Sequence, residues 1–252
     1  MDTPGATWRD LQRSTVPAEW SREWPAGWHV DVVTETGSTN ADLLAAASAG
    51  APNRSVLCAL HQTAGRGRLD RTWEAPPGAN LLASLLMREL PVHLHEITQR
   101  LALAAIIAVR RTAGVEARLK WPNDVLLGGA KLAGVLAQAG GVGGVEYVVA
   151  GIGLNVGWAP AQAALLGAEF AAAGVLAELL VAWDELPVDI TQLYRESLAT
   201  IGAEVAVHVA AGDSTDIVRG RAVDVDADGR LVVIDDCAVT HRFATGDVVH
   251  LR

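Results

Sequence analysis

Three arginines and two glycines gather in one short segment of the chain. Residues 65–68 read Gly-Arg-Gly-Arg, and Arg71 follows three positions later. Guanidinium groups present forked donors that suit carboxylate or phosphate oxygens, and glycine lets the backbone fold closely around a ligand. Because glycine and arginine are also common in solvated loops, this segment alone supports an anion site and an ordinary surface loop about equally.

A second polar group follows at 120–124, with the sequence Lys-Trp-Pro-Asn-Asp. The amide of Asn123 and the carboxylate of Asp124 could hold a nucleotide or its Mg²⁺, an ion that takes one or two carboxylates with phosphate oxygens and water. An ordinary Pro-Asn turn is the alternative. Lys131 either extends from a strand edge or places its charge on a phosphate or a ligand carboxylate, and Gly134 leaves room for close backbone approach.

Ser38, Thr39 and Asn40 stand where a helix is expected to begin. Helix capping is the stronger interpretation of these residues, although a helix N-terminus with spare hydroxyls also suits a ligand carbonyl. His93 and His95 have no third metal ligand near them in sequence, so we expect solvated histidines rather than a metal site.

Two familiar nucleotide signatures are absent from the sequence. Gly151 and Gly153 are followed by Val156 where a dinucleotide fingerprint needs its third glycine, and there is no phosphate loop of the G-x-x-x-x-G-K-S/T type. If ATP binds here, it binds by another route. Asn155 could then read a base edge or close a turn.

The elements that must position these residues alternate between strands and helices. Strands are expected at 29–33, 55–60, 80–87, 117–121, 124–127, 131–138 and 147–151, and helices at 40–49, 96–112, 161–183 and 188–198. Gly128-Gly129 predicts a hairpin between two of the strands. The segment 61–79 reads as a long loop, which in a compact domain is usually functional or disordered.

Composition changes after residue 202, where short alternating strands are expected at 204–209, 221–225, 231–234, 240–243 and 248–251. Such a run predicts a small barrel or sandwich. Residues 1–28 read as a lead-in whose tryptophans cover an apolar surface. We therefore expect an α+β fold, with a mixed sheet and packed helices over 29–201 and a small β-barrel over 202–252.

The bulk composition excludes several classes of protein. A formal net charge of −9 over 252 residues argues against a general nucleic-acid binder. The longest apolar run, 101–109, is roughly half a membrane span, and no export signal is visible, so the sequence predicts a soluble cytoplasmic protein. Cys58 and Cys237 are too few for a disulfide framework or a zinc cluster.

Taken together, seven motifs resemble, in order, those of biotin protein ligases. They lie at residues 37–40, 62–68, 71–73, 78–80, 120–124, 131–134 and 151–155. The resemblance covers residues 30–157 strongly and the C-terminal strands by position and pattern. Nothing before residue 30 matches the DNA-binding winged helix of bifunctional members, so the chain resembles the monofunctional kind. The implied fold is a catalytic domain like that of class II aminoacyl-tRNA synthetases, followed by an SH3-like barrel.

The resemblance also implies an activity. Biotin and MgATP would give biotinyl-5′-adenylate and pyrophosphate, and the biotinyl group would then move to a lysine of a biotin carboxyl carrier protein or domain. The expected cofactors are ATP and Mg²⁺, and no nucleic-acid or membrane partner is expected. A homodimer is compatible with the sequence, which does not fix the oligomeric state.

Each site residue carries an implied role. Those expected at biotin are Ser38, Thr39, Asn40, Gln62, Gly65, Arg66, Gly67, Arg68, Lys131 and Gly134. Those expected at ATP or the adenylate are Arg71, Trp73, Asn123, Lys131 and Asn155, with Asp124 for Mg²⁺. Arg66, Arg68 and Lys131 are the expected catalytic residues, because they can offset the repulsion between the biotin carboxylate and the α-phosphate. Lys120 is expected to join this cationic group.

The adenylate is a mixed anhydride that water destroys, which gives a closing loop a purpose. We expect residues 64–73 to be mobile without ligands and ordered with them, with Asp70, where many relatives have glycine, stiffening the loop. Two alternatives stay open, a lipoate-protein ligase-like enzyme and a non-catalytic biotin-sensing regulator. The motifs at 66–68 and 120–124 favour biotin, and the acidic balance argues against the regulator.

Overall fold

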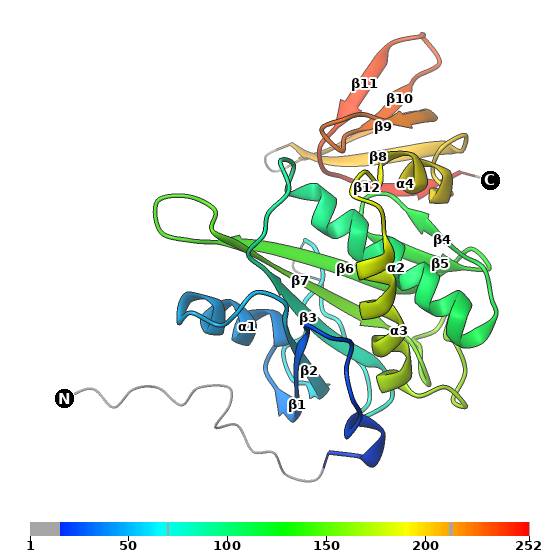
Figure 1. Cartoon of the computed structure of the whole chain (residues 1–252). Helices are drawn as coiled ribbons and strands as arrows, with labels where there is room; N and C mark the ends of the chain where they lie inside the picture. The colour runs from blue at the N-terminus through cyan, green and yellow to red at the C-terminus, as the bar shows by residue number, and fades with distance from the viewer. Residues whose placement is uncertain (1–15, 70, 212–213, 252) are drawn as a thin grey trace.

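The computed structural model describes residues 16–69, 71–211 and 214–251, and Figure 1 shows two sheets, the smaller of which lies at the C-terminal end of the chain. Asp70 and the first fifteen residues of the lead-in lie outside the described residues. No helix within the described ranges is long and apolar enough to cross a membrane.

The larger sheet is mixed and has seven strands in the order β1-β2-β3-β7-β6-β5-β4. Its strands are β1 (His29–Thr36), β2 (Ser55–Gln62), β3 (Leu81–Met87), β4 (Ala117–Lys120), β5 (Asp124–Leu127), β6 (Ala130–Gly140) and β7 (Tyr147–Leu154). β1 and β2 are parallel, whereas the remaining neighbours are antiparallel. The hairpin expected at Gly128-Gly129 is confirmed, since both glycines have positive φ between β5 and β6.

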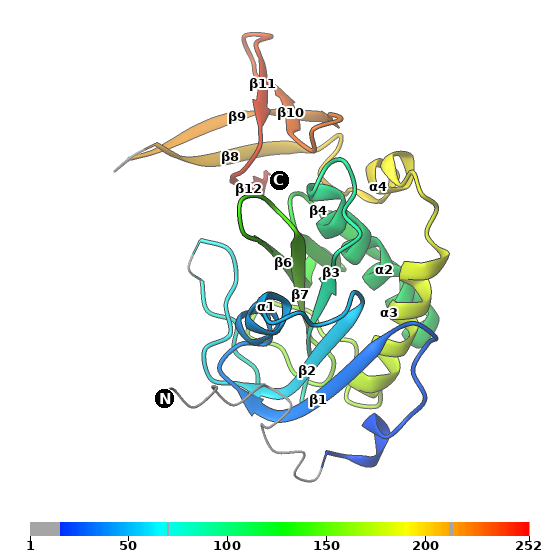
Figure 2. The ribbon, with the colours of Figure 1, turned by 60° about the vertical axis from the view of Figure 1, so that its left-hand side comes forward.

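Helices cover both faces of this sheet (Figure 2). α1 (Thr39–Ser48) packs on one face, and α2 (His95–Ala113) and α3 (Ala172–Glu185) pack together on the other. Successive strand residues point to opposite faces. Leu57 and Val149 accordingly pack with α1, whereas Val56 and Val148 join the core under α2 and α3.

The smaller sheet is antiparallel, with five strands in the order β11-β10-β9-β8-β12. They are β8 (Glu204–Ala211), β9 (Ser214–Val225), β10 (Leu231–Ile234), β11 (Thr240–Phe243) and β12 (Asp247–His250). β9 is longer than the expected strand at 221–225, because its first half pairs with β8 in a long hairpin (Figure 2). The α+β fold with a small C-terminal β domain is confirmed.

The helix expected at 161–183 is wrong in its first half. α3 begins only at Ala172, because the preceding backbone bonds to strand ends instead of to itself. Ala164 N–H donates to the carbonyl of Lys131 at 2.9 Å, and Gly167 N–H donates to that of Val156 at 2.9 Å. The second expected helix is shorter than predicted, since α4 spans Thr191–Ser197.

The described end of the lead-in folds onto α3. A short 3-10 helix, η2 (Ala18–Trp20), precedes Trp28, whose indole N–H donates to Asp184 at 3.0 Å. Trp20 and Trp28 are buried, as the covering role expected for the tryptophans requires.

Candidate active site

A cavity of about 490 Å³ opens on the α1 face of the larger sheet, within the size range of small-molecule sites. Its walls come from the start of α1, the loop between β2 and β3, strands β5 to β7, and the turn before β12. The sequence places these elements far apart, and the sheet order brings them together.

Apart from Gly65 and Lys120, the site residues expected from sequence line this cavity. They are Ser38, Thr39, Asn40, Gln62, Arg66, Gly67, Arg68, Arg71, Trp73, Asn123, Asp124, Lys131, Gly134 and Asn155. Gly65 lies behind the lining. A side chain at Gly65 would lie 2.4 Å from the carbonyl oxygen of Trp73, so this glycine serves the fold of the loop rather than the cavity wall.

Uncharged polar groups form one end of the cavity. The side-chain oxygen of Gln62 accepts hydrogen bonds from the backbone and hydroxyl of Thr39 at 2.8 and 3.0 Å. The amide of Asn40 donates to Leu136 O and Gln138 Oε1, both at 3.0 Å. Ser38 precedes α1 as predicted, but its side chain makes no capping hydrogen bond and faces the cavity instead.

Ser84 of β3 forms hydrogen bonds with the side chains at this end and was not predicted from the sequence. Its Oγ lies 2.8 Å from Thr39 Oγ1 and 2.6 Å from Asn40 Oδ1, and the residue is fully buried. Gly151 of β7 leaves no room beside Asn40, because a side chain there would lie 2.2 Å from Asn40 Oδ1.

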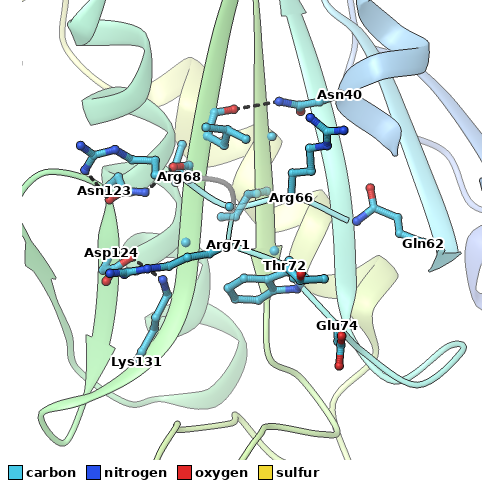
Figure 3. A pocket seen from close by; sticks show the side chains of 18 of the residues that line it. Asn40, Gln62, Arg66, Arg68, Arg71, Thr72, Glu74, Asn123, Asp124 and Lys131 are labelled. Atoms are coloured by element: carbon cyan, nitrogen blue, oxygen red, sulfur yellow. Dashed lines mark hydrogen bonds and ion pairs between the residues drawn. The ribbon is translucent and has the colours of Figure 1, made fainter. Parts of the chain in front are cut away.

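The glycine-arginine loop, residues 64–73, folds back on itself across the cavity. Arg66 forms an antiparallel bridge with Thr72, and Gly67 N–H donates to the carbonyl of Arg71 at 2.7 Å. In Figure 3 the side chain of Arg66 extends from this loop toward the side formed by Asn40.

Charged groups gather at the opposite end, where ion pairs already hold them. Lys131 Nζ lies 2.7 Å from Asp124 Oδ1, and Arg71 donates to Asp247 at 2.5 Å. Arg68 donates to Asn123 Oδ1 at 3.2 Å and to Thr245 Oγ1 at 2.8 Å. These contacts gather the charged side chains at one end of the cavity.

The pKa shifts keep Arg71 positively charged and Asp247 negatively charged at neutral pH. Burial lowers the pKa of Arg68, although nearby Asp124 and Asp247 oppose that effect. The hydrogen bond from Arg71 lowers the pKa of Asp247, and the same bond raises that of Arg71. Lys120 is not one of the described residues that line the cavity. Burial lowers the pKa of His250, and the charge of Lys120 adds to that effect.

Trp73 forms the wall between the two ends. Its indole N–H is buried and has no hydrogen-bond partner among the described residues, and Lys131 Nζ lies 5.6 Å from the ring centroid. Gly153 makes room for the ring, since a side chain there would lie 2.3 Å from Trp73 Cε2. A buried donor without a partner is costly, so it favours a ligand acceptor at this position.

Asn155 is buried and already bonded within the protein. Its amide donates to Ala164 O at 2.9 Å, and its oxygen accepts from Asn80 at 3.3 Å. The sequence left two roles open for Asn155, to contact a base edge or to close a turn. These contacts support the closing of the turn after β7.

The sequence did not predict that the smaller sheet contributes Thr245 and Asp247 to the site. Asp247 and Thr245 lie 176 and 177 positions from their arginine partners, and no local pattern announces such pairs. Ser84 did carry a signal, because it is the one polar residue in an otherwise apolar strand.

Three carboxylates of the described part of the chain line the cavity, those of Glu74, Asp124 and Asp247, and Asp124 is the one that the sequence predicted for magnesium. Among the described residues no group of three or more His, Cys, Asp or Glu side chains could hold a metal. Asp124 still fits Mg²⁺, because this ion is commonly held by one or two carboxylates plus substrate phosphates.

Comparison with known proteins agrees with this geometry. Residues 32–155 match the Biotin/lipoate A/B protein ligase family, and residues 206–251 match the Biotin protein ligase C terminal domain. Together these matches define the chain as a ligase of that broader class.

Individual relatives narrow the class further. The chain is 40% identical over 251 residues to the biotin--[acetyl-CoA-carboxylase] ligase of Mycobacterium tuberculosis, covering 90% of this chain and 91% of that protein. It is 28% identical to the bifunctional ligase/repressor BirA of Bacillus subtilis over 228 residues, covering 81% and 67% respectively. The chain therefore belongs to the biotin protein ligase family.

Solved structures agree on the fold. The biotin protein ligase from Aquifex aeolicus in complex with biotin and ATP superposes with a TM-score of 0.72 at 22% identity, covering 89% of this chain and 99% of that one.

Proposed function

We propose that this biotin protein ligase activates biotin with ATP in the cavity described above and passes the biotinyl group to a lysine of a biotin carboxyl carrier protein or domain. The division of the cavity into an uncharged polar end and a cationic end carries the proposal. Biotin has a neutral ureido ring and an anionic tail, and ATP adds a triphosphate beside that tail. The use of ATP supports the cytoplasm as the place of the reaction.

The uncharged end suits the ureido ring. That ring presents one carbonyl and two N–H groups, so it needs donors and acceptors without charge. Ser38, Thr39, Asn40 and Gln62 supply them, and Ser84 holds two of these side chains in place.

The cationic end suits the first chemical step. A biotin carboxylate oxygen attacks the α-phosphorus of ATP, the new O–P bond forms, and the bond to the bridging oxygen breaks as pyrophosphate leaves. Arg66, Arg68 and Lys131 offset the repulsion between the two anions and stabilise the charge that develops on the α-phosphoryl oxygens. Trp73 packs against the adenylate, and its free indole N–H supplies a donor.

Magnesium would supply further neutralisation of the phosphates when bound. Asp124 is the side chain that would hold it, which requires the Asp124 to Lys131 ion pair to open or to be shared. Lys131 would then be free to reach the reacting carboxylate and phosphate.

The acceptor is proposed from chemistry and from one relative. An acyl-adenylate is a good acyl donor to an amine, and the Mycobacterium tuberculosis relative is named as a ligase that acts on acetyl-CoA-carboxylase. Both observations support a lysine on the carrier domain of a carboxylase.

One experiment tests the whole proposal. The protein is mixed with MgATP, labelled biotin and a biotin-carrier domain, and label on the acceptor lysine is measured together with pyrophosphate release. Labelled lipoate in place of biotin tests the lipoate ligase alternative. Pyrophosphate release absent with both acids would revive the regulator and remove the enzymatic proposal.

Variants then test the assigned roles. Lys131→Ala and Arg66→Ala should impair adenylate formation while the fold stays intact, because both remove a charge from the reacting anions. Arg110→Ala is the matched control, since this arginine on α2 is largely exposed and lies outside the cavity. Adenylate formation at the wild-type rate in Lys131→Ala and Arg66→Ala would remove their roles.

A further inference from the structure

Glu74 is a carboxylate of the cavity lining to which the mechanism above gives no role. The other two carboxylates that line the cavity in the described part of the chain are each held by a cation. Asp124 Oδ1 lies 2.7 Å from Lys131 Nζ, and Asp247 Oδ2 accepts from Arg71 at 2.5 Å. Glu74 is exposed and forms no hydrogen bond or ion pair among the described residues. Both of its oxygens are therefore open to a ligand in the cavity.

A third group of cavity-lining residues belongs to neither the uncharged end nor the cationic end. It consists of Trp158, Pro160 and Ala163 from the connection between β7 and α3, none of which carries a charge. This connection passes beside β6, because Ala164 N–H donates to the carbonyl of Lys131 at 2.9 Å. The third group is therefore a neighbour of the place proposed for the α-phosphate.

Glu74 lies on the same side of the cavity as this group. Figure 3 shows Glu74 and Lys131 at the end of the view away from Asn40. The chain that follows Glu74 reaches the connection between β7 and α3, since Gly157 N–H donates to Ala79 O at 2.8 Å. The ureido ring and the phosphates are assigned to the other parts of the cavity, so the nucleoside of ATP is the part left for this side.

The charge of Glu74 selects which part of a nucleoside it can bind. A carboxylate only accepts hydrogen bonds, and it repels phosphate oxygens. The adenine edge presents one amino group beside ring nitrogens that accept, so a carboxylate would meet one donor and repulsion next to it. The ribose presents two neighbouring hydroxyls, and each can donate to one carboxylate oxygen. The ribose diol is therefore the part of ATP that matches Glu74.

We propose that Glu74 is a specificity-determining residue of the adenylation site, and that its carboxylate binds the 2′- and 3′-hydroxyls of the ATP ribose. This inference rests on the proposed function, because it concerns the nucleotide that the site uses. It makes the site selective for ribonucleotides, since only the two hydroxyls together offset the repulsion between Glu74 and the phosphates.

Glu74→Ala and Glu74→Gln test the proposal on the full chain. Pyrophosphate release is measured with saturating biotin and no acceptor, and kcat/KM is compared for ATP, 2′-dATP and 2′,3′-dideoxy-ATP. Glu116→Gln is the matched control, since the side chain of this glutamate is 77% exposed and lies outside the cavity. Comparing the nucleotides within each variant separates recognition of the ribose from a general effect on the fold.

We expect the wild type to prefer ATP over 2′,3′-dideoxy-ATP by about tenfold or more, the size of a hydrogen bond to a charged group. 2′-dATP, which keeps one hydroxyl, should lie between them. In Glu74→Ala, kcat/KM for ATP should fall about tenfold or more, whereas that for 2′,3′-dideoxy-ATP should stay constant or rise, because the variant removes a carboxylate that repels the phosphates. Glu74→Gln should show an intermediate preference, because its amide keeps one acceptor oxygen. Glu116→Gln should match the wild type.

Equal kcat/KM for ATP and 2′,3′-dideoxy-ATP in the wild type overturns the inference, and so does a preference that Glu74→Ala leaves unchanged. Preferential use of GTP by the wild type but not by Glu74→Ala also overturns it, because guanine offers two adjacent N–H donors and the carboxylate would then read the base. If Glu74→Ala does not fold, Glu74→Gln still decides, since its preference for ATP must fall below that of the wild type. A wild type that releases no pyrophosphate from any of these nucleotides refutes the proposed function instead, so the two failures are distinguishable.

Discussion

Gly153→Ala offers a strong test of how the larger sheet positions the indole of Trp73. The added Cβ would lie 2.3, 2.6 and 2.8 Å from Cε2, Nε1 and Cδ2 of Trp73. Ordinary carbon contacts lie at about 3.5–4 Å, so the ring would have to move by roughly 1 Å or more. The backbone at Gly153 is ordinary strand, paired with Leu82 and Gly134, and it accepts alanine without strain.

Two opposing effects set the expected stability. Overpacking costs about 1–3 kcal/mol, and replacing a strand glycine by alanine returns about 0.4–1 kcal/mol through the unfolded chain. The free energy of unfolding should therefore fall by roughly 0.5–2 kcal/mol. Activity should fall further, because displacing a positioning group by about 1 Å can cost on the order of 100-fold in rate.

The assays are urea unfolding and kcat/KM for adenylate formation. Gly144→Ala is the control, since no atom lies within 4 Å of its added Cβ. In a Trp73→Ala background the same Gly153→Ala change should cost almost no stability, because its clash is gone. Wild-type kcat/KM in Gly153→Ala would refute the claim that this glycine fixes the indole for adenylation.

Three further predictions concern the support of the site. Asp247→Asn should raise KM for ATP about two- to fivefold, the size of an exposed ion pair that holds Arg71. Because the native pKa of Asp247 is depressed, its stabilisation is present above its unfolded pKa of about 3.9 and is lost as pH falls through the folded value. Unfolding curves of wild type and Asp247→Asn should thus converge at low pH, and a gap that widens there would contradict this. Ser84→Ala should lower the free energy of unfolding by about 1–3 kcal/mol and raise KM for biotin, because it leaves the buried Asn40 Oδ1 without this partner; an unchanged KM would remove its supporting role. Residues 64–73 should gain protection from hydrogen exchange when biotin and ATP bind, and equal exchange with and without ligands would count against a closing loop.

Most of the fold followed from local patterns. Strands such as Ser55–Gln62 and Leu81–Met87 are apolar runs between turn residues, and tertiary contacts agree with them. The error at 161–171 has a physical cause. An alanine-rich stretch predicts a helix by intrinsic propensity, but its N–H groups bond to carbonyls at the ends of β6 and β7 instead. Propensity is a weak guide wherever neighbouring elements offer competing hydrogen bonds.

Prediction of the site residues succeeded where the evidence was local and failed where it depended on tertiary structure. Residues clustered in short motifs, such as Arg66 with Arg68 and Asn123 with Asp124, were identified because their types and spacing are visible locally. Lys120 was predicted to lie with them because it is close in sequence, yet it is not one of the described residues that line the cavity. Alternate residues of β4 and the turn after it point to different faces, which sequence spacing alone did not resolve.

The smaller sheet contacts two arginines of the candidate active site, which its sequence did not indicate. Arg68 and Arg71 of the glycine-arginine loop each bond to the turn before β12, through Thr245 and Asp247. Trp121 Nε1 also donates to Gly229 O at 3.0 Å, which links the two sheets. A shift of one sheet against the other would therefore move two arginines of the candidate site. We expect substitutions at Thr245 or Asp247 to impair adenylate formation for this reason, whereas those at the uncharged end should affect biotin binding alone.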